Sequence, residues 1–168
     1  KNLLGELNRG WYVGATLLDF ERSGVDYSAG ARRTLEELVD FCKETTLNGT
    51  VLAKDPLVRR RLADLAIETE VSRLISYNIA WMQQSGLVPN KEASMGKVFG
   101  TELQQRMARS GMKILGLYGQ LEPGSKYAPM KGRIERSYMT TVSSTLAAGT
   151  SEIQRSIIAT RGLGLPRG

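Results

Sequence analysis

The side chains that could do chemistry in this sequence are carboxylates, lysines, tyrosines and hydroxyls, because it contains no histidine and a single cysteine. The lack of histidine excludes Ser-His-Asp and Cys-His catalysis and the HExxH zinc site. One cysteine excludes internal disulfides and CxxC sites. Cys42 has apolar neighbours, which favours a small buried side chain over a reactive thiol. We therefore predict no metal site, and chemistry must come from the other side chains or from a bound cofactor.

The first candidate is the stretch LDFERS, residues 18–23, which places Asp19, Glu21 and Arg22 beside apolar residues. Carboxylates with perturbed pKa values occur at catalytic sites. On composition alone, however, a surface ion pair among these charges is favoured over a catalytic carboxylate. Both interpretations stay open at this point.

The second candidate is a helix start near the end of the chain, at Gly149-Thr150-Ser151. Its free backbone N–H groups and positive dipole end could hold an anion or a polar cofactor group. The helix cap is predicted at Thr150 or Ser151, and Ser151 with Gln154 fits a capping box. Every helix has such an end, so this feature alone is a weak indication of a site.

The formal net charge of +6 permits anionic partners without choosing among them. The stretch VRRRL, residues 58–62, is the strongest basic cluster, but successive helical residues point about 100° apart, so its arginines fan around the helix. It also lacks interleaved aromatic residues. We expect a solvated face or a subunit contact and no nucleic acid partner. No apolar run is long enough to span a bilayer, so we expect no membrane segment and a cytoplasmic location.

The spacing of apolar residues predicts an all-α, antiparallel helical bundle. Helical spacing starts at Trp11, and the stretch SGVDYSAG, residues 23–30, interrupts it, so one helix bends there or two helices meet. Asp55 is a natural N-cap followed by Pro56 at the first helical position. This helix should run to about Gln84. Its apolar stripe is formed by Ile67, Val71, Leu74, Ile75 and Met82.

The second half of the chain continues the pattern without any convincing strand pair. A long helix is predicted from near Lys91 to about Leu117, and a shorter one over about Gly132–Leu146. Gly162, Gly164 and Pro166 should end the last helix. The apolar stripe of the long helix is formed by Phe99, Leu103, Met107, Ile114 and Leu115.

Several stretches together resemble one enzyme family. The segment AAGTSEIQRSIIATRGLGLPRG, residues 147–168, is similar to the C-terminal signature of acyl-CoA dehydrogenases. The segment GELNRGWYVGATLLDFER resembles the family's junction between its middle β domain and its C-terminal helical domain. DPLVRRRLADLAIE and EASMGKVFGTELQQRMARSGMKILGLYGQL resemble its core helices, in order. The likeness covers essentially the whole chain.

This resemblance implies an FAD-dependent oxidation of an acyl-CoA substrate. A carboxylate takes the α-proton while the β-hydrogen leaves as hydride to the flavin. Residues 1–10 would then be a loop leading from a middle β domain, and residues 11–168 the C-terminal helical bundle domain. The resemblance further implies a homotetramer or heterotetramer through the helical domain, and an electron-transfer protein as acceptor. The 168 residues alone should be inactive, because the flavin ring would lie between domains.

Site residues follow from the resemblance position by position. Many members carry the base directly before the Gly-Thr pair, where this chain has Ala148. A minority of members carry the base in a Glu-Arg pair on the first helix of this domain, which makes Glu21 the candidate catalytic base. The resemblance makes Asp19, Arg22 and Gly149 candidate substrate contacts. Thr150 and Glu152 match the stretch that touches the flavin.

Two stretches depart from the family pattern. An Arg-x-x-Phe-Gly sequence, whose Arg meets the FAD pyrophosphate of a neighbouring subunit, is replaced here by ETTLNGT, Glu44–Thr50. A Gln-x-x-Gly-Gly sequence is replaced by KILGLYG, Lys113–Gly119. Some family members work as heteromers in which one partner keeps these contacts. The alternative function is therefore a non-catalytic partner subunit that supplies an interface and partial FAD contacts.

Overall fold

The computed structural model describes residues 2–21 and 24–166, and for residues 18–21 it describes the backbone alone. The elements, in chain order, are α1 (Gly10–Glu21), α2 (Val25–Glu44), β1 (Thr46–Leu47), β2 (Thr50–Val51), η1 (Leu52–Lys54), α3 (Pro56–Gln84), α4 (Asn90–Leu115), η2 (Gly116–Gln120), η3 (Pro129–Gly132), α5 (Arg133–Ser144), α6 (Ser151–Ile157) and the π-helical turn η4 (Ile158–Gly162).

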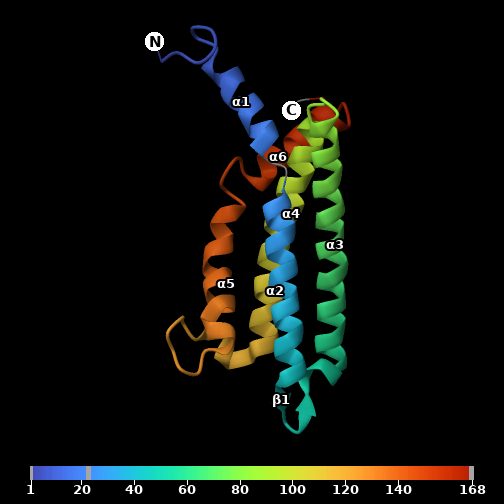
Figure 1. The fold of residues 1–168 in the computed structure, drawn as a ribbon, viewed down its shortest axis with the longest axis vertical. Helices are drawn as coiled ribbons and strands as arrows, with labels where there is room; N and C mark the ends of the chain where they lie inside the picture. The colour runs from blue at the N-terminus through green and yellow to red at the C-terminus, as the bar shows by residue number, and fades with distance from the viewer. Residues whose placement is uncertain (1, 22–23, 167–168) are drawn as a thin grey trace.

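Helices α2, α3, α4 and α5 lie side by side and alternate in direction, which confirms the predicted antiparallel bundle (Figure 1). Helix α4 is the centre of the bundle, because it packs against α2, α3, α5 and α6. The α2–α3 connection and the α4–α5 connection lie at one end of the bundle. The chain returns to the opposite end for α6, close to where α1 meets α2.

The predicted meeting of two helices within residues 23–30 is confirmed at the start of that stretch, whose residues from Val25 onward belong to α2. Helix α1 ends at Glu21, and α2 begins at Val25 after Gly24, whose φ of 76° is left-handed and suits glycine. The Ser76 hydroxyl of α3 donates to the Gly24 carbonyl over 2.9 Å, which ties this break to the bundle. Helix α1 itself extends beyond the bundle (Figure 1), and Trp11 is 82% exposed.

Helix α3 begins as the sequence predicts. The Asp55 side chain accepts hydrogen bonds from the backbone N–H groups of Leu57 (2.8 Å) and Val58 (3.0 Å), and Pro56 occupies the first helical position. These contacts satisfy two N–H groups that have no partner within the helix. The predicted end at Gln84 is also confirmed.

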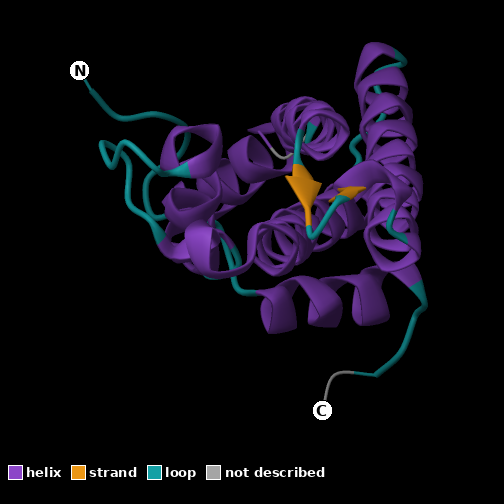
Figure 2. Cartoon of the chain, turned by 90° about the horizontal axis from the view of Figure 1, so that it is seen from below, coloured by secondary structure: helices purple, strands orange, loops and turns teal. Residues whose placement is uncertain are grey.

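The expectation of no strand pairs is wrong at one place. β1 and β2 form an antiparallel two-stranded ladder that pairs Thr46 with Val51 and Leu47 with Thr50. Asn48 and Gly49 turn the hairpin with positive φ angles of 50° and 78°. Strands of two residues are too short to produce an alternating pattern. Figure 2 views the molecule from this end and shows the two strands among the helix ends.

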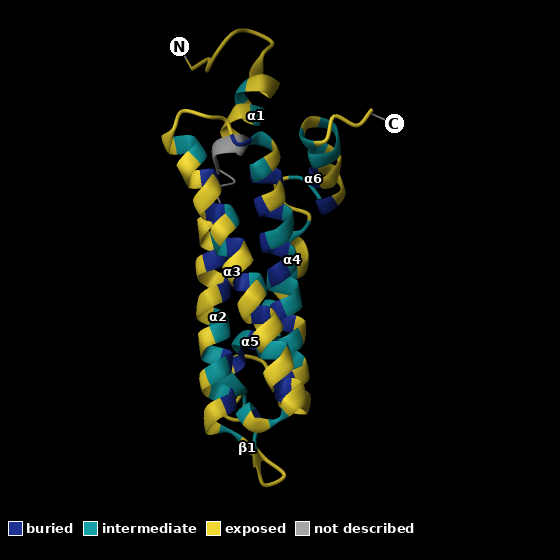
Figure 3. Cartoon of the chain, turned by 90° about the vertical axis from the view of Figure 1, so that its right-hand side faces the viewer, coloured by how far each residue is buried: buried dark blue, intermediate teal, exposed yellow. Residues whose placement is uncertain are grey.

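The apolar stripe of α4 faces the core as predicted, whereas that of α3 does not. Leu103, Met107, Ile114 and Leu115 are buried and Phe99 is half-buried. On α3, Ile67 and Leu74 are 64% and 56% exposed. The face that α3 buries contains small polar residues instead, together with a few apolar ones: Val58, Leu65, Thr69, Ser72, Ser76 and Ile79. Figure 3 shows the buried residues on the inner faces and exposed ones along the outer side of α3.

Cys42 is fully buried, as predicted, and burial raises the pKa of its thiol. It belongs to a small apolar cluster at the hairpin end of the bundle, formed by Cys42, Leu52, Val58 and Ile114. Within residues 2–21 and 24–166, no helix is long and apolar enough to cross a membrane.

Candidate functional site

The candidate site lies at the end of the bundle where α1 ends and α6 begins (Figure 1). Glu21 is the last residue of α1 and Asp19 lies two residues before it, but their side chains fall outside the described part of the chain. Arg22 lies outside the described residues altogether. The roles assigned to these three residues therefore stay predictions. The α6 side of the site is described in full.

Thr150 is the N-cap of α6, and its hydroxyl oxygen accepts a hydrogen bond from the backbone N–H of Ile153 over 3.3 Å. The predicted capping box of Ser151 and Gln154 is wrong. Because the cap falls at Thr150, the third helical residue is Ile153, which has no polar side chain to reach back. Gln154 reaches further back, and its Nε2 donates to the Ala148 carbonyl over 3.0 Å.

Ala148 and Gly149 form a left-handed turn before the cap, with φ angles of 54° and 91°. The turn brings Gly149 so close to α6 that a Cβ atom there would lie 2.6 Å from Gln154 Nε2. Both the left-handed conformation and the close approach of Gln154 therefore favour glycine at position 149. Ala148, the residue at the usual base position, is exposed and carries no ionisable group.

Glu152 lies in the first turn of α6 and is exposed. A hydrogen bond from the Thr150 side chain, followed by one from its own backbone N–H, lowers the pKa of its carboxyl. Arg155 and Lys97 lower it further by their positive charge. Glu152 is therefore a fixed negative charge at neutral pH, and its carboxylate is a weak proton acceptor.

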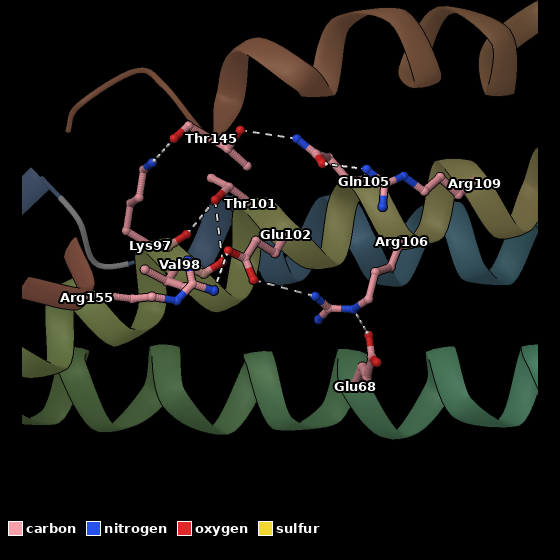
Figure 4. A network of polar contacts seen from close by, with 10 residues as sticks. All are labelled: Glu68, Lys97, Val98, Thr101, Glu102, Gln105, Arg106, Arg109, Thr145 and Arg155. Atoms are coloured by element: carbon pink, nitrogen blue, oxygen red, sulfur yellow. Dashed lines mark hydrogen bonds and ion pairs between the residues drawn. The ribbon is translucent and has the colours of Figure 1, made fainter. Parts of the chain in front are cut away.

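Sequence reasoning missed Lys97, a fully buried lysine of α4. Its Nζ donates to the carbonyl of Thr145, at the end of α5, over 3.2 Å (Figure 4). The available signal was its position in step with the buried residues of the same helix, three and four residues from Ala93, Gly100 and Thr101. Lysine is almost never fully buried, so its type does not indicate a core position.

A chain of ion pairs joins α6 to the two long helices beneath it (Figure 4). Arg155 Nη2 of α6 lies 2.7 Å from Glu102 Oε1 of α4, and Arg106 Nη1 lies 3.9 Å from Glu102 Oε2. Arg106 Nε then donates to Glu68 of α3 over 2.8 Å. This network borders a cavity of about 350 Å³ that Ser151, Glu152 and Arg109 help to line.

The two stretches that depart from the family pattern lie at the opposite end of the bundle. Glu44–Thr50 contains the turn and first strand of the β1–β2 hairpin, and Lys113–Gly119 spans the end of α4 and most of η2. Both are far from α6 along the bundle axis in Figure 1. The start of α6 and the hairpin of this chain are therefore at opposite ends of the bundle.

The antiparallel helical fold, with its capped last helix, defines an all-α bundle domain. The family described as acyl-CoA dehydrogenase, C-terminal domain, matches residues 8–163. The chain therefore belongs to the acyl-CoA dehydrogenase family, as the resemblance of its sequence predicted.

Similar proteins include the acyl-CoA dehydrogenase FadE26 of Mycobacterium tuberculosis, which is 35% identical over 99% of this chain and 42% of its own length. Among solved structures, the Tcur3481-Tcur3483 steroid ACAD matches 98% of this chain and 42% of its own, with 30% identity and a TM-score of 0.85. The ChsE4-ChsE5 complex of M. tuberculosis matches 84% of this chain and 37% of its own, with 37% identity and a TM-score of 0.77. This chain spans between 40% and 42% of the length of the first curated relatives it matches.

Proposed function

We propose that this chain is the C-terminal helical domain of an FAD-dependent acyl-CoA dehydrogenase, which catalyses α,β-dehydrogenation of an acyl-CoA thioester. The observation that carries the proposal is the family match over residues 8–163, which includes the signature around the start of α6. The domain supplies one wall of the active site, and the missing walls belong to the parts of the relatives that this chain does not span.

Glu21 is the proposed catalytic base. The reaction needs a carboxylate that accepts the proton from Cα. Ala148 cannot accept one, and Glu152 has a lowered pKa that makes it a poor acceptor. Glu21 ends α1 at the same end of the bundle as α6. Asp19, Arg22 and Gly149 are proposed to contact the substrate around this base.

The start of α6 fits a polar cofactor such as FAD. Ser151 is one of the residues that line the cavity, and its buried hydroxyl has no hydrogen-bond partner among the described residues. Thr150 and Glu152 flank it and would hold the cofactor by their hydroxyl and carboxylate groups. The chemistry supplied by bound FAD is acceptance of the hydrogen that leaves Cβ as hydride. An electron-transfer protein is the proposed final acceptor.

The hairpin end fits the FAD pyrophosphate less well than the start of α6 fits a polar cofactor group. Glu44–Thr50 contains no arginine or lysine that could neutralise phosphate charge. We therefore assign no pyrophosphate contact to this stretch.

A homotetramer or heterotetramer through the helical domain is part of the proposal. The exposed apolar side chains of α3 support it, and they include Ile67, Leu74 and Trp81.

The test of Glu21 is its replacement by Gln in the full-length FAD-containing enzyme. Glutamine keeps the size of the side chain but cannot accept the proton, so kcat should fall by about 10²-fold or more with FAD content unchanged. Glu122→Gln, at an exposed glutamate between η2 and η3, is the matched control and should retain most of the turnover. Near-normal turnover of Glu21→Gln with full FAD content would remove Glu21 from the mechanism.

A non-catalytic partner subunit is the second candidate function. The observations that favour it are Ala148 at the usual base position and a hairpin without a cation. It predicts that full-length protein purified alone contains no FAD, and that co-purification with its partner restores stoichiometric FAD. A protein with a single type of subunit that contains FAD, and whose flavin absorbance is lost on addition of an acyl-CoA, would exclude this function.

A further inference from the structure

Lys97 is the largest side chain that is fully buried among the described residues, with 1% of its surface exposed. Lysine normally extends its ammonium group into water even when its methylene chain is covered. Removing the charge from water is unfavourable unless hydrogen bonds compensate for it. The position of Lys97 therefore requires specific polar partners.

One such partner is the carbonyl of Thr145, which accepts from Lys97 Nζ over 3.2 Å. Thr145 is the C-cap of α5, where carbonyl groups have no donor within the helix and the dipole end is negative. The same oxygen accepts from the backbone N–H of Ser151 over 3.1 Å. A single carbonyl thus joins α4, the end of α5 and the first residue of α6.

The connection between α5 and α6 needs this support because of its backbone conformation. Ala148 and Gly149 both have positive φ angles, and a non-glycine residue holds such an angle only where its surroundings impose it. From the α6 side, Gln154 fixes the Ala148 carbonyl. From the α4 side, Lys97 fixes the Thr145 carbonyl at the start of the connection.

We propose that Lys97 is the positioning residue of the candidate site. Its ammonium group anchors the Thr145–Thr150 connection to α4, and thereby fixes the positions of Thr150 and Glu152. The part of this inference that concerns cofactor contact rests on the proposed function. The anchoring itself rests on the contact between Lys97 and Thr145, beside which Gln105 Nε2 of α4 donates to the Thr145 hydroxyl over 3.2 Å.

The test is Lys97→Met in the full-length protein, read by amide hydrogen exchange. Methionine has a similar length but cannot donate a hydrogen bond. The amides of residues 146–151 should exchange about tenfold faster, as expected for the loss of one charge-assisted hydrogen bond, while those of α2 and α3 change less. Thr101→Val is the matched control, because Thr101 is equally buried on α4 and its hydroxyl bonds only within that helix. It should leave residues 146–151 unchanged.

Lys97→Arg retains a charged donor and should restore most of the local protection from exchange. If Lys97→Met does not fold, Lys97→Gln replaces it, because glutamine has a shorter side chain whose amide donor does not reach as far. Exchange at 146–151 that stays at the wild-type rate, or rises equally in all helices, would overturn the proposal. FAD affinity is measured on the same variants and should fall about tenfold, in step with the local exchange. Faster local exchange with unchanged FAD affinity would uphold the anchoring and count against the proposed cofactor contacts of Thr150 and Glu152.

Discussion

The two ends of the bundle are closed by different kinds of contact. At the hairpin end, an apolar cluster of Cys42, Leu52, Val58 and Ile114 packs beneath two-residue strands. At the α6 end, hydrogen bonds and ion pairs hold the connection between α5 and α6, through Lys97, Gln154 and Arg155. Apolar packing excludes water without fixing a direction, whereas hydrogen bonds fix the orientation of the groups they join. At the end where chemistry is proposed, directional contacts hold the connection between α5 and α6.

The largest effect is expected from the hairpin end. Ile114→Ala removes a buried side chain from the apolar cluster and should lower the free energy of unfolding by about 2–5 kcal/mol. Leu57 lies in the first turn of nearby α3 and its side chain is 66% exposed, so Leu57→Ala should cost about 0.5 kcal/mol or less. Denaturant unfolding of the full-length protein measures both. Equal losses for the two variants would show that the cluster does not close this end.

The next effect tests the turn at the α6 end. Gly149→Ala adds a Cβ atom 2.6 Å from Gln154 Nε2 at a φ of 91°, and should cost about 1–3 kcal/mol. Gly124 also has a positive φ, 100°, but has open space around it. Gly124→Ala therefore isolates the backbone strain and should cost less. A loss at Gly149 no larger than that at Gly124 would mean that the contact with Gln154 contributes nothing.

The N-caps of α3 and α6 should contribute different amounts to the free energy of unfolding, and this difference is expected to be smaller. Asp55 accepts two backbone hydrogen bonds at the start of α3, so Asp55→Ala should cost about 0.5–2 kcal/mol, near the upper part of that range. Thr150 accepts one longer bond, and Thr150→Ala should cost less. Asp55→Asn keeps an acceptor and should be nearly neutral. Thermal unfolding compares the three variants, and a larger loss for Thr150→Ala would reverse the proposed ranking.

The smallest effect concerns pH. The pKa of Glu152 is lowered from its ordinary value of 4.5, so its carboxylate stabilises the folded state above that pH. This contribution is lost as pH falls through the lowered value. The difference in melting temperature between wild type and Glu152→Gln should therefore be small, constant well above pH 4.5, and should shrink as pH falls below that value. A difference that grows on acidification would contradict the sign of the shift.

The parts of the fold that the sequence predicts are those with a local cause. The cap at Asp55, the proline after it and the break at Gly24 each act within a few residues, and all three are confirmed. The burial of the α4 stripe is also confirmed, because α4 is surrounded by other helices of the same chain. The hairpin was not predicted, since its register depends on a turn with left-handed Asn48 rather than on an apolar pattern.

The face that α3 buries could not be read from its pattern. An amphipathic pattern indicates which side of a helix prefers to leave water, but not whether this chain supplies the covering surface. Helix α3 instead buries the small polar residues Thr69, Ser72 and Ser76, and the Ser76 hydroxyl donates to the carbonyl of Gly24, just before α2.

For the site, the sequence located the start of α6 but not its support. The cap at Thr150 was one of two predicted positions, and the glycine before it was recognised as part of the signature. The roles of Gln154 and Lys97 depend on bonds to carbonyls that are 6 and 48 residues away in sequence. Such contacts leave no local pattern in a single sequence.

Cys42 gives the hairpin end a built-in chemical reporter. Because it is the only thiol in this chain and is fully buried with a raised pKa, a thiol reagent can modify the chain only after that end has opened. The rate of modification therefore measures opening kinetics at one defined place, with no introduced label. Substitutions at the α6 end that leave this rate unchanged would show that the two ends open independently.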